Sequence, residues 1–530
     1  MPKRPRTGRS RTVGESFYDD IVIGGGSAGS VLASRLSEDP ARRVLLVEAG
    51  PHYGGATATP PDILDGNVIS VQHSWGYSAR ITADRSIPFL QGRVTGGSSA
   101  INLTAAVRGT RQDFTEWAEL GNPLWSWEDV LPRYVALEDD LDFGHRRFHG
   151  RGGPVPVRRW RDEELTPVQE AFYSACLASG LPDVPDHNHP DSTGVGPNPL
   201  HRQDTRVRVS TAMGYLWPAR GRANLEILSG TVVDRVLFRD GKAYGVRLSI
   251  GSGWQQMRAR RVVLAAGVVG SPSILLRSGV GPAEHLRELG IGVEADLPGV
   301  GAGLTDQPRI GVFLTPRPGA ENQGSPPGQV VVRTTSQAEG TPGRFNDLYY
   351  IMVNRIDLKN HFAGLRGTTS AESVFGVMAL IRRVHSRGRI TLASADPRVA
   401  PTIDLGYFSD ERDYAVMAEA VRGCWEFTQS PKIRDYGQDV LGLDEDTIDS
   451  PEALRRYVTD YADSAYNAVG TARMGPDGDP GAVVDQRCKV RGVDNLYVAD
   501  ASVMPAMVCA NTHLTVVMIG EHAAAMLREG

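Results

Sequence analysis

Residues 17–30 read FYDDIVIGGGSAGS, and this stretch decides the fold class. Segment 17–23 ends in a β-branched apolar run, which is typical of a buried strand. Three glycines follow it, and the spacing of apolar residues after them predicts a helix through Leu36. A second apolar run, 44–47, ends at Glu48. Strand, glycine turn, helix and strand together predict the first βαβ unit of a doubly wound α/β domain.

The glycines of this turn have the spacing of a dinucleotide-binding site. Gly24, Gly26 and Gly29 let backbone N–H groups and a helix N-terminus approach a pyrophosphate. Glu48 follows Gly29 by 19 residues, where a carboxylate can accept hydrogen bonds from a ribose diol. The alternative is a glycine-rich turn that only tightens packing. The unit alone does not distinguish FAD from NAD(P), but its place near the start of the chain, with a strand and helix returning at the end, favours FAD.

The bulk composition excludes several classes of protein. The 530 residues are too many for one compact core and predict two or three interlocked domains. A net charge of -5 argues against a nucleic-acid partner. The sequence contains no run of about 18 apolar residues, so a membrane span is not expected. Basic residues gather in 1–14 without an apolar stretch, which predicts a disordered basic tail and no secretory signal.

Cysteine usage indicates the compartment. The four cysteines lie far apart and form no Cys-x-x-Cys pair; they are Cys176, Cys424, Cys488 and Cys509. That spacing argues against a zinc site or a disulfide framework and predicts a cytoplasmic location.

The rest of the chain alternates strands and helices. Residues 51–153 are rich in Gly, Ser and Trp and predict a long, loop-like region with short helical pieces. The turn Asp240-Gly241 predicts a hairpin, and residues 310–393 predict a mainly antiparallel sheet. Further expected elements are strands at 225–228, 232–238, 243–248, 261–264 and 495–499, and helices after 267, at 413–429 and at 512–528.

Several motifs follow one another in a fixed order. They are GRVTGGSSAIN at 92–102, GVVGSPSILLRSGVG at 267–281, LPGVG at 297–301, SRG at 386–388, SADP at 394–397 and DASVMP at 500–505. In these motifs the chain resembles the glucose–methanol–choline (GMC) oxidoreductases over nearly its whole length. It departs from the pattern at Val268, where a small residue is usual.

The resemblance implies an FAD site built from distant segments. Glycine backbone such as Gly96-Gly97 can lie against a flat ring system where a side chain would collide. The residues expected to contact FAD are Gly24, Gly26, Ser27, Ala28, Gly29, Glu48, Ala49, Arg93, Gly96, Gly97, Ser98, Asn102, Leu103, Val233, Ala266, Asp500, Ala501, Thr512, His513 and Leu514.

Attachment of the cofactor is expected to be noncovalent. Some relatives attach FAD through a histidine in the first motif, and the matching position here is Ile101. Isoleucine has no nucleophile, so the resemblance implies noncovalent FAD.

The resemblance also implies a reacting centre. Alcohol oxidation needs a base for the hydroxyl proton and a hydride transfer to flavin N5. The family usually places a histidine first and a second His or Asn about 45 residues later. Here Asn467 stands at the first place, and the stretch Asn511-Thr512-His513 provides His513 for the second. Because an amide is no base, we expect His513 to accept the proton and Asn467 to orient the hydroxyl.

Two domains are expected. Segments 15–155, 205–310 and 465–530 would form the FAD-binding domain, and 156–204 with 311–464 the substrate-binding domain. Tyr349, Tyr350, Met352 and Tyr466 are candidates for the substrate pocket. The expected function is FAD-dependent oxidation of a primary or secondary alcohol of a small molecule, with oxygen or another electron acceptor.

Other functions remain open as alternatives. One is a non-redox or light-driven relative, resembling a hydroxynitrile lyase or a decarboxylase. Another is a catalytically silent FAD-binding protein. A metal site is not expected, because His187-Asn188-His189 has no second group at metal-ligand spacing. Ser99 and Ser271 lack the Gly-x-Ser-x-Gly elbow of hydrolases.

Overall fold

The computed structural model describes most of the chain and confirms the mixed α/β class. The basic segment 1–14, expected to be a disordered tail, lies outside the described residues. No helix in the described ranges has the length and apolar character needed to cross a bilayer. The described residues are 17–251, 253–320, 325–340, 343–356, 358, 365, 369–371 and 373–529.

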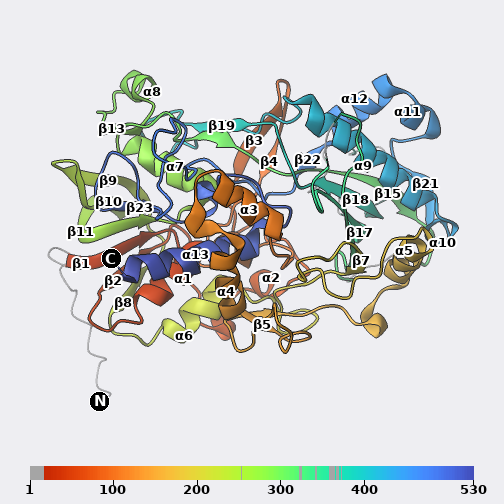
Figure 1. Cartoon of the computed structure of the whole chain (residues 1–530), viewed down its shortest axis with the longest axis horizontal. Coiled ribbons are helices and arrows are strands. Elements are labelled where there is room, and N and C mark those ends of the chain that lie inside the picture. Colours follow the sequence, from red (N-terminus) through yellow and green to blue (C-terminus); the bar gives the residue numbers. More distant parts are fainter. Residues whose placement is uncertain are drawn as a thin grey trace, which may run out of the picture.

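The first sheet contains the glycine turn and occupies the left half of Figure 1. Its parallel part has the order β8-β2-β1-β11, and β23 pairs with β11. Strands β10 and β9 extend it as an antiparallel hairpin, whose turn at Asp240-Gly241 has positive φ at both residues, as predicted. The strands are β1 (Phe17–Ile23), β2 (Val44–Val47), β8 (Leu225–Leu228), β9 (Val233–Arg239), β10 (Lys242–Ile250), β11 (Gly253–Leu264) and β23 (Leu496–Val498).

Close packing explains the glycines between β1 and α1 (Ser27–Leu36). Gly24 has φ +96°, and a Cβ on Gly29 would lie 1.7 Å from the Gly24 carbonyl oxygen. The last helix, α13 (Thr512–Glu529), lies along α1, where a Cβ on Gly520 would come 2.9 Å from Val31 (Figure 1). The end of the chain is therefore held beside its first helix.

The second sheet is antiparallel, as predicted for 310–393, and lies in the right half of Figure 1. Its order is β21-β15-β18-β17-β16-β7, and β22 pairs with β15. Helices α5 (Pro167–Ala178), α9 (Glu411–Gln429) and α12 (Pro451–Tyr461) form a hydrophobic core with one face. The strands are β7 (Gly194–Pro197), β15 (Pro308–Pro316), β16 (Val330–Thr334), β17 (Leu348–Ile356), β18 (Val374–Ile381), β21 (Gly437–Val440) and β22 (Asp463–Ser464).

A third sheet corrects the prediction for residues 51–153. This region was expected to be loop-like with short helical pieces. Helices α3 (Arg111–Glu119) and α4 (Trp127–Leu137) fit that expectation, whereas the β3–β4 hairpin does not. The hairpin pairs with β20, more than 300 residues later, so local sequence could not reveal it. The order is β14-β19-β20-β3-β4, with β3 (Tyr77–Thr82), β4 (Arg85–Phe89), β14 (Ala302–Leu304), β19 (Gly388–Thr391) and β20 (Thr402–Asp404).

Shorter elements connect the sheets. Helix α7 follows β11 at the predicted place. The 3-10 helices, of three or four residues each, lie mostly in the loops between the other elements. The remaining elements are α2 (Pro61–Leu64), α6 (Trp217–Ala219), α7 (Gly267–Arg277), α8 (Ala283–Glu288), α10 (Pro431–Arg434), α11 (Glu445–Asp449), β5 (Glu138–Asp140), β6 (Val155–Val157), β12 (Val280–Gly281) and β13 (Ala295–Asp296).

Candidate active site

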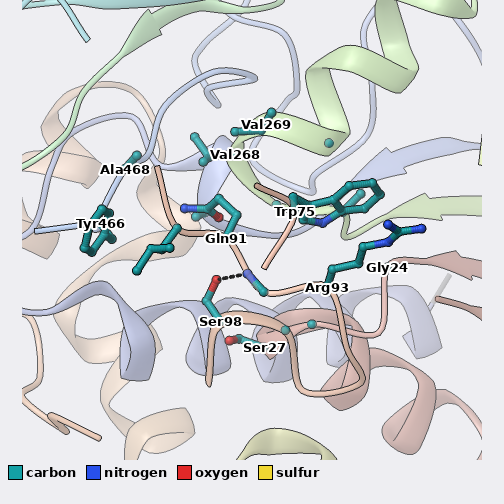
Figure 2. A pocket seen from close by; sticks show the side chains of 18 of the residues that line it. Gly24, Ser27, Trp75, Gln91, Arg93, Ser98, Val268, Val269, Tyr466 and Ala468 are labelled. Carbon is teal, nitrogen blue, oxygen red and sulfur yellow. Dashed lines mark hydrogen bonds between the residues drawn. The ribbon is translucent and has the colours of Figure 1, made fainter. Parts of the chain in front are cut away.

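A cavity of about 900 Å³ runs from the glycine turn after β1 to the second sheet. Figure 2 places Gly24 and Ser27 at one side of it and Tyr466 and Ala468 at the other. Eighteen of the expected site residues line this cavity: Gly24, Gly26, Ser27, Ala28, Glu48, Ala49, Arg93, Gly97, Ser98, Asn102, Leu103, Val233, Ala266, Asn467, Asp500, Ala501, Thr512 and His513.

Three expected residues lie behind the lining. Gly29 packs against the Gly24 carbonyl, and the Gly96 N–H donates to the Gly25 carbonyl at 2.7 Å. Leu514 is fully buried in the core of the first sheet. These residues support the cavity wall without forming it.

Glu48 is oriented by backbone groups at the end of β2. Its Oε2 accepts the Gly25 N–H at 2.8 Å, and its Oε1 accepts the Gly50 N–H at 2.7 Å. Burial raises the pKa of this carboxyl, and the two N–H bonds oppose that rise. A carboxylate fixed in this way in the cavity wall has lone pairs left for a ribose diol.

Two glycine loops form a narrow cradle. A Cβ on Gly97, which has φ +53°, would lie 2.7 Å from the Cα of Gly26. Beside them Ser98 Oγ accepts the Gly92 N–H at 3.1 Å (Figure 2). Asp500 Oδ2 accepts the Gly267 N–H at 2.8 Å and so fixes the start of α7. Bare backbone at the N-terminus of α1 fits the pyrophosphate of a dinucleotide.

His513 lies in the first turn of α13, and its imidazole reaches the cavity wall. Neither ring nitrogen has a hydrogen-bond partner among the described residues. Burial lowers the pKa of His513 to about 4, so the ring is neutral near pH 7. A buried imidazole with both nitrogens unsatisfied can bind a ligand or accept its proton.

His201 is a neighbour that sequence reasoning missed. Its ring centroid lies 4.2 Å from that of His513. Its Nδ1 contacts the Val209 carbonyl at 2.9 Å, and its Nε2 contacts Asn102 Oδ1 at 3.1 Å. Nothing in its local sequence marks it, because it lies more than 300 residues from His513.

Asn467 belongs to a network with three further residues that sequence reasoning did not assign to the site. Its Nδ2 donates to Gln307 Oε1 at 2.9 Å, and Arg382 Nη1 donates to the same oxygen at 2.6 Å. Arg382 Nη2 also donates to Asn511 Oδ1 at 3.1 Å. The network links Asn467 to Asn511, whereas His513 contacts His201. One signal was visible in the sequence, because Asn511 stands two places before His513 in the stretch quoted for the second catalytic position.

The backbone before Asn467 is strained. Tyr466 has φ +58°, a left-handed conformation that is uncommon for a bulky residue. Its N–H donates to Ser464 Oγ at 2.8 Å, and Arg309 lies 5.2 Å from its ring. Such strain is typical of functional sites, because the surrounding structure must impose it.

Two of the four candidates for the substrate pocket lie in the cavity wall. Tyr349 and Tyr466 line the cavity, but Tyr350 and Met352 do not. Those two belong to the core with α9, where a Cβ on Gly423 would lie 2.3 Å from Tyr350 Oη. Side chains alternate along β17, so Tyr349, Ile351 and Val353 face the cavity and the even positions face the helices.

A group of metal-ligand type lies elsewhere in the described residues. Glu138, Asp140 and His149 are close together and buried. His149 Nε2 also contacts Asp186 at 2.9 Å, and Arg159 Nη1 donates to Asp140 at 2.9 Å. Burial opposes a charge on His149, but its three acidic neighbours raise its pKa to about 10. Because protonated His149 and arginines pair with these carboxylates, the cluster is an ion-pair network that has no need of a metal. His187 lies outside it, buried, with neither ring nitrogen bonded to a described residue.

Known proteins resemble the chain along its length. Family models described as GMC oxidoreductase match residues 18–309 and 384–520. An oxygen-dependent choline dehydrogenase from Photobacterium profundum is 34% identical, over 96% of this chain and 92% of the relative. A 5-(hydroxymethyl)furfural oxidase from a Methylovorus species is also 34% identical, over 96% of this chain and 98% of the relative. The crystal structure of pyridoxine 4-oxidase from Mesorbium loti superposes with a TM-score of 0.88 at 30% identity, covering 97% of this chain and 99% of that one.

Proposed function

The chain belongs to the GMC oxidoreductase family, and from that premise we propose that it oxidises a primary or secondary alcohol of a small molecule to an aldehyde or ketone. One observation carries the proposal. A neutral imidazole, His513, lies in the cavity wall, and neither of its nitrogens is bonded to a described residue. The choline, hydroxymethylfurfural and pyridoxine named for the relatives are alcohols, which supports the same class of substrate.

The enzyme is an FAD-dependent oxidoreductase. The glycine cradle and Glu48 fit the pyrophosphate and a ribose of this cofactor. When bound, FAD supplies the acceptor for a hydride from the alcohol carbon. We propose that it binds noncovalently, because Ile101, in the cavity wall, offers no nucleophile.

His513 and Asn467 divide the work on the hydroxyl group. Because one Nδ2 hydrogen of Asn467 bonds to Gln307, its second hydrogen is left to donate to the hydroxyl oxygen. This contact would turn the hydroxyl hydrogen toward an acceptor, and we propose that neutral His513 is that acceptor. His513 is thus the base and Asn467 the orienting group.

The proposed active site lies between two proposed domains. We propose that 15–155, 205–310 and 465–530 bind FAD, and that 156–204 and 311–464 bind the substrate. The first sheet is built only from the former segments, and the second sheet mostly from the latter. The third sheet joins strands of both sets. The cavity takes lining residues from each set, as expected for a cofactor facing its substrate.

Oxygen is the first electron acceptor to test, because the relatives are named as oxidases or as oxygen-dependent. A cytoplasmic location is supported by the four cysteines, which are all buried and unpaired. The lyase-like or decarboxylase-like alternative is not favoured, because the relatives named above are oxidases and a dehydrogenase.

The decisive experiment is anaerobic titration of the purified yellow holoenzyme with a panel of alcohols. We expect one class of alcohol to bleach the flavin absorbance near 450 nm, and admission of air to restore it if oxygen is the acceptor. An enzyme that retains FAD but is bleached by no alcohol in the panel would support the catalytically silent alternative.

A further inference from the structure

Arg382 is a buried cation in the wall of the catalytic cavity. It follows β18, is 1% exposed and lines the cavity. Its two Nη atoms donate to amide oxygens of Gln307 and Asn511, and its Nε has no partner among the described residues. The ring centroid of Tyr349 lies 4.1 Å from its guanidinium carbon. Its hydrogen-bond and ring contacts are therefore all to neutral side chains.

Other buried arginines differ from it. Arg309, which also lines the cavity, forms a 2.9 Å ion pair with Asp463. Arg202 and Arg208 have no carboxylate partner in the described part of the chain, but they donate to backbone carbonyls and do not line the cavity. Among the described residues, Arg382 is a cavity-lining guanidinium at full burial with no ion pair to a carboxylate.

A buried cation is costly unless an anion compensates it. Burial lowers the pKa of Arg382 to about 10, and the guanidinium of Arg333 adds to that effect. The guanidinium fork matches a carboxylate in geometry and charge. An anion that enters with the substrate would supply the missing compensation.

We propose that Arg382 binds the carboxylate of the substrate, so that the preferred alcohols are short hydroxy acids. This inference rests on the proposed alcohol oxidation, because it places the carboxylate next to the group that holds the hydroxyl.

The spacing in the cavity sets the length of the substrate. Arg382 Nη1 and Asn467 Nδ2 donate to the same oxygen, through bonds of 2.6 and 2.9 Å. The two nitrogens are thus no farther apart than the sum of these lengths, so one molecule reaches both only if its hydroxyl and carboxylate are close. The nearby wall is apolar, with Ile351, Val353, Met378 and Leu380, which favours an apolar substituent.

A 2-hydroxy acid with an aromatic substituent meets these conditions. Its oxidation to a 2-oxo acid breaks the C–H and O–H bonds of the carbinol and forms a C=O bond. The hydride carries two electrons to bound FAD, and the hydroxyl proton passes to His513. The carboxylate is unchanged, so its only part is to bind Arg382.

Matched probes separate the charge from the shape. Phenylacetate and phenylacetamide lack the hydroxyl, so they report binding alone. Calorimetry or perturbation of the flavin spectrum measures that binding. Mandelate and mandelamide report anaerobic flavin reduction. The variants are Arg382→Gln and, as a control, Arg383→Gln. Arg383 is the next residue along the chain, pairs with Glu116 and does not line the cavity. Far-UV circular dichroism and FAD content verify the fold of each variant.

We expect wild-type enzyme to bind phenylacetate about 10- to 100-fold more tightly than phenylacetamide, the range for one charge-assisted contact. Mandelate should reduce the flavin at lower concentrations than mandelamide by a similar factor. Arg382→Gln should abolish both preferences, and Arg383→Gln should retain them.

Four results would overturn the inference. The first is equal binding of acid and amide by the wild type, and the second is an unchanged preference in Arg382→Gln. The third is a variant that changes only the flavin reduction potential, because Arg382 would then compensate charge on the cofactor. Reduction by neutral alcohols alone overturns this inference but preserves the proposed function. Arg382-dependent binding of phenylacetate without reduction by any alcohol would keep Arg382 as a carboxylate site but overturn the proposed function.

Discussion

The imidazole rings of His513 and His201 lie 4.2 Å apart between centroids, with 42° between their planes. Both are buried, and burial lowers the pKa of each, with His513 adding to the shift at His201. His201 is held by the Val209 carbonyl and Asn102, whereas the nitrogens of His513 have no partner in the described structure. The ring of His201, held by its hydrogen bonds, thus packs against the ring of His513, the proposed base.

Loss of the His513 imidazole should slow flavin reduction. We expect His513→Ala to lower the anaerobic single-turnover rate by at least about 100-fold, the usual contribution of a general base. Stopped-flow absorbance measures this rate on enzyme that retains its FAD. His522→Gln is the control, because His522 lies on the same helix but not in the cavity wall. An unchanged rate in His513→Ala would remove His513 from the mechanism.

The acid limit of activity should lie at low pH. Burial favours neutral His513 and lowers its pKa to about 4, against about 6.5 for a free histidine. The base therefore stays unprotonated as pH falls, and is lost only when pH passes below about 4. The pH profile of kcat/KM with a substrate that does not titrate checks this. A limb near pH 6.5 would contradict the assignment, provided that FAD stays bound throughout.

Changing Glu48 should weaken FAD binding. Both carboxylate oxygens accept backbone N–H groups, from Gly25 and Gly50. Glutamine offers one oxygen and one NH2 group, so in Glu48→Gln one of these backbone N–H groups would face the side-chain NH2 group. The glycine turn would then lose one hydrogen bond. We expect FAD affinity to fall about 10- to 100-fold, as for one lost bond to a charged group. Fluorescence titration of apoprotein with FAD measures it. Equal affinities would mean that Glu48 does not shape the cofactor site.

FAD should leave the denatured protein. Ile101 lines the cavity at the position where some relatives carry a reactive histidine, and isoleucine forms no bond to a flavin. Precipitation with trichloroacetic acid should put all the yellow colour in the supernatant. Flavin that pellets with the protein would identify a covalent link through another residue.

The ion pairs of His149 should make stability depend on pH. Its folded pKa is raised to about 10, so its stabilisation is complete below the unfolded value near 6.5 and is lost as pH rises to 10. The slope is about 1.4 kcal/mol per pH unit between these values. We expect the melting temperature to fall over this window.

Two variants test the assignment of that slope. His149→Gln should melt lower at pH 7, because it leaves buried carboxylates unpaired at a cost of about 3–5 kcal/mol. It should also lose much of the slope above pH 7. His145→Gln, in the same segment but exposed, should melt like wild type throughout. A slope that survives in His149→Gln would assign the pH dependence to another group.

Local patterns were enough for the first βαβ unit. The apolar run of β1, the glycines and Glu48 are contiguous or nearly so, and backbone sterics and burial act on them directly. The antiparallel character of the second sheet was also predictable. The β3–β4 hairpin was not, because its partner β20 comes from a distant segment. Alternation along β17 puts Tyr349 on the opposite face from Tyr350 and Met352, so it could have shown that the three do not share one pocket, but only the structure decided which face lines the cavity.

The sequence by itself determined the fold class, the family resemblance and most of the cavity lining, because each depends on short motifs that carry their own backbone chemistry. Only the tertiary structure decided the neighbours of the reacting groups. It brought His201 to His513, and Gln307 with Arg382 to Asn467, across separations of up to 312 residues. A side chain acts on whatever lies within a few ångströms of it, and chain folding rather than residue order sets that distance.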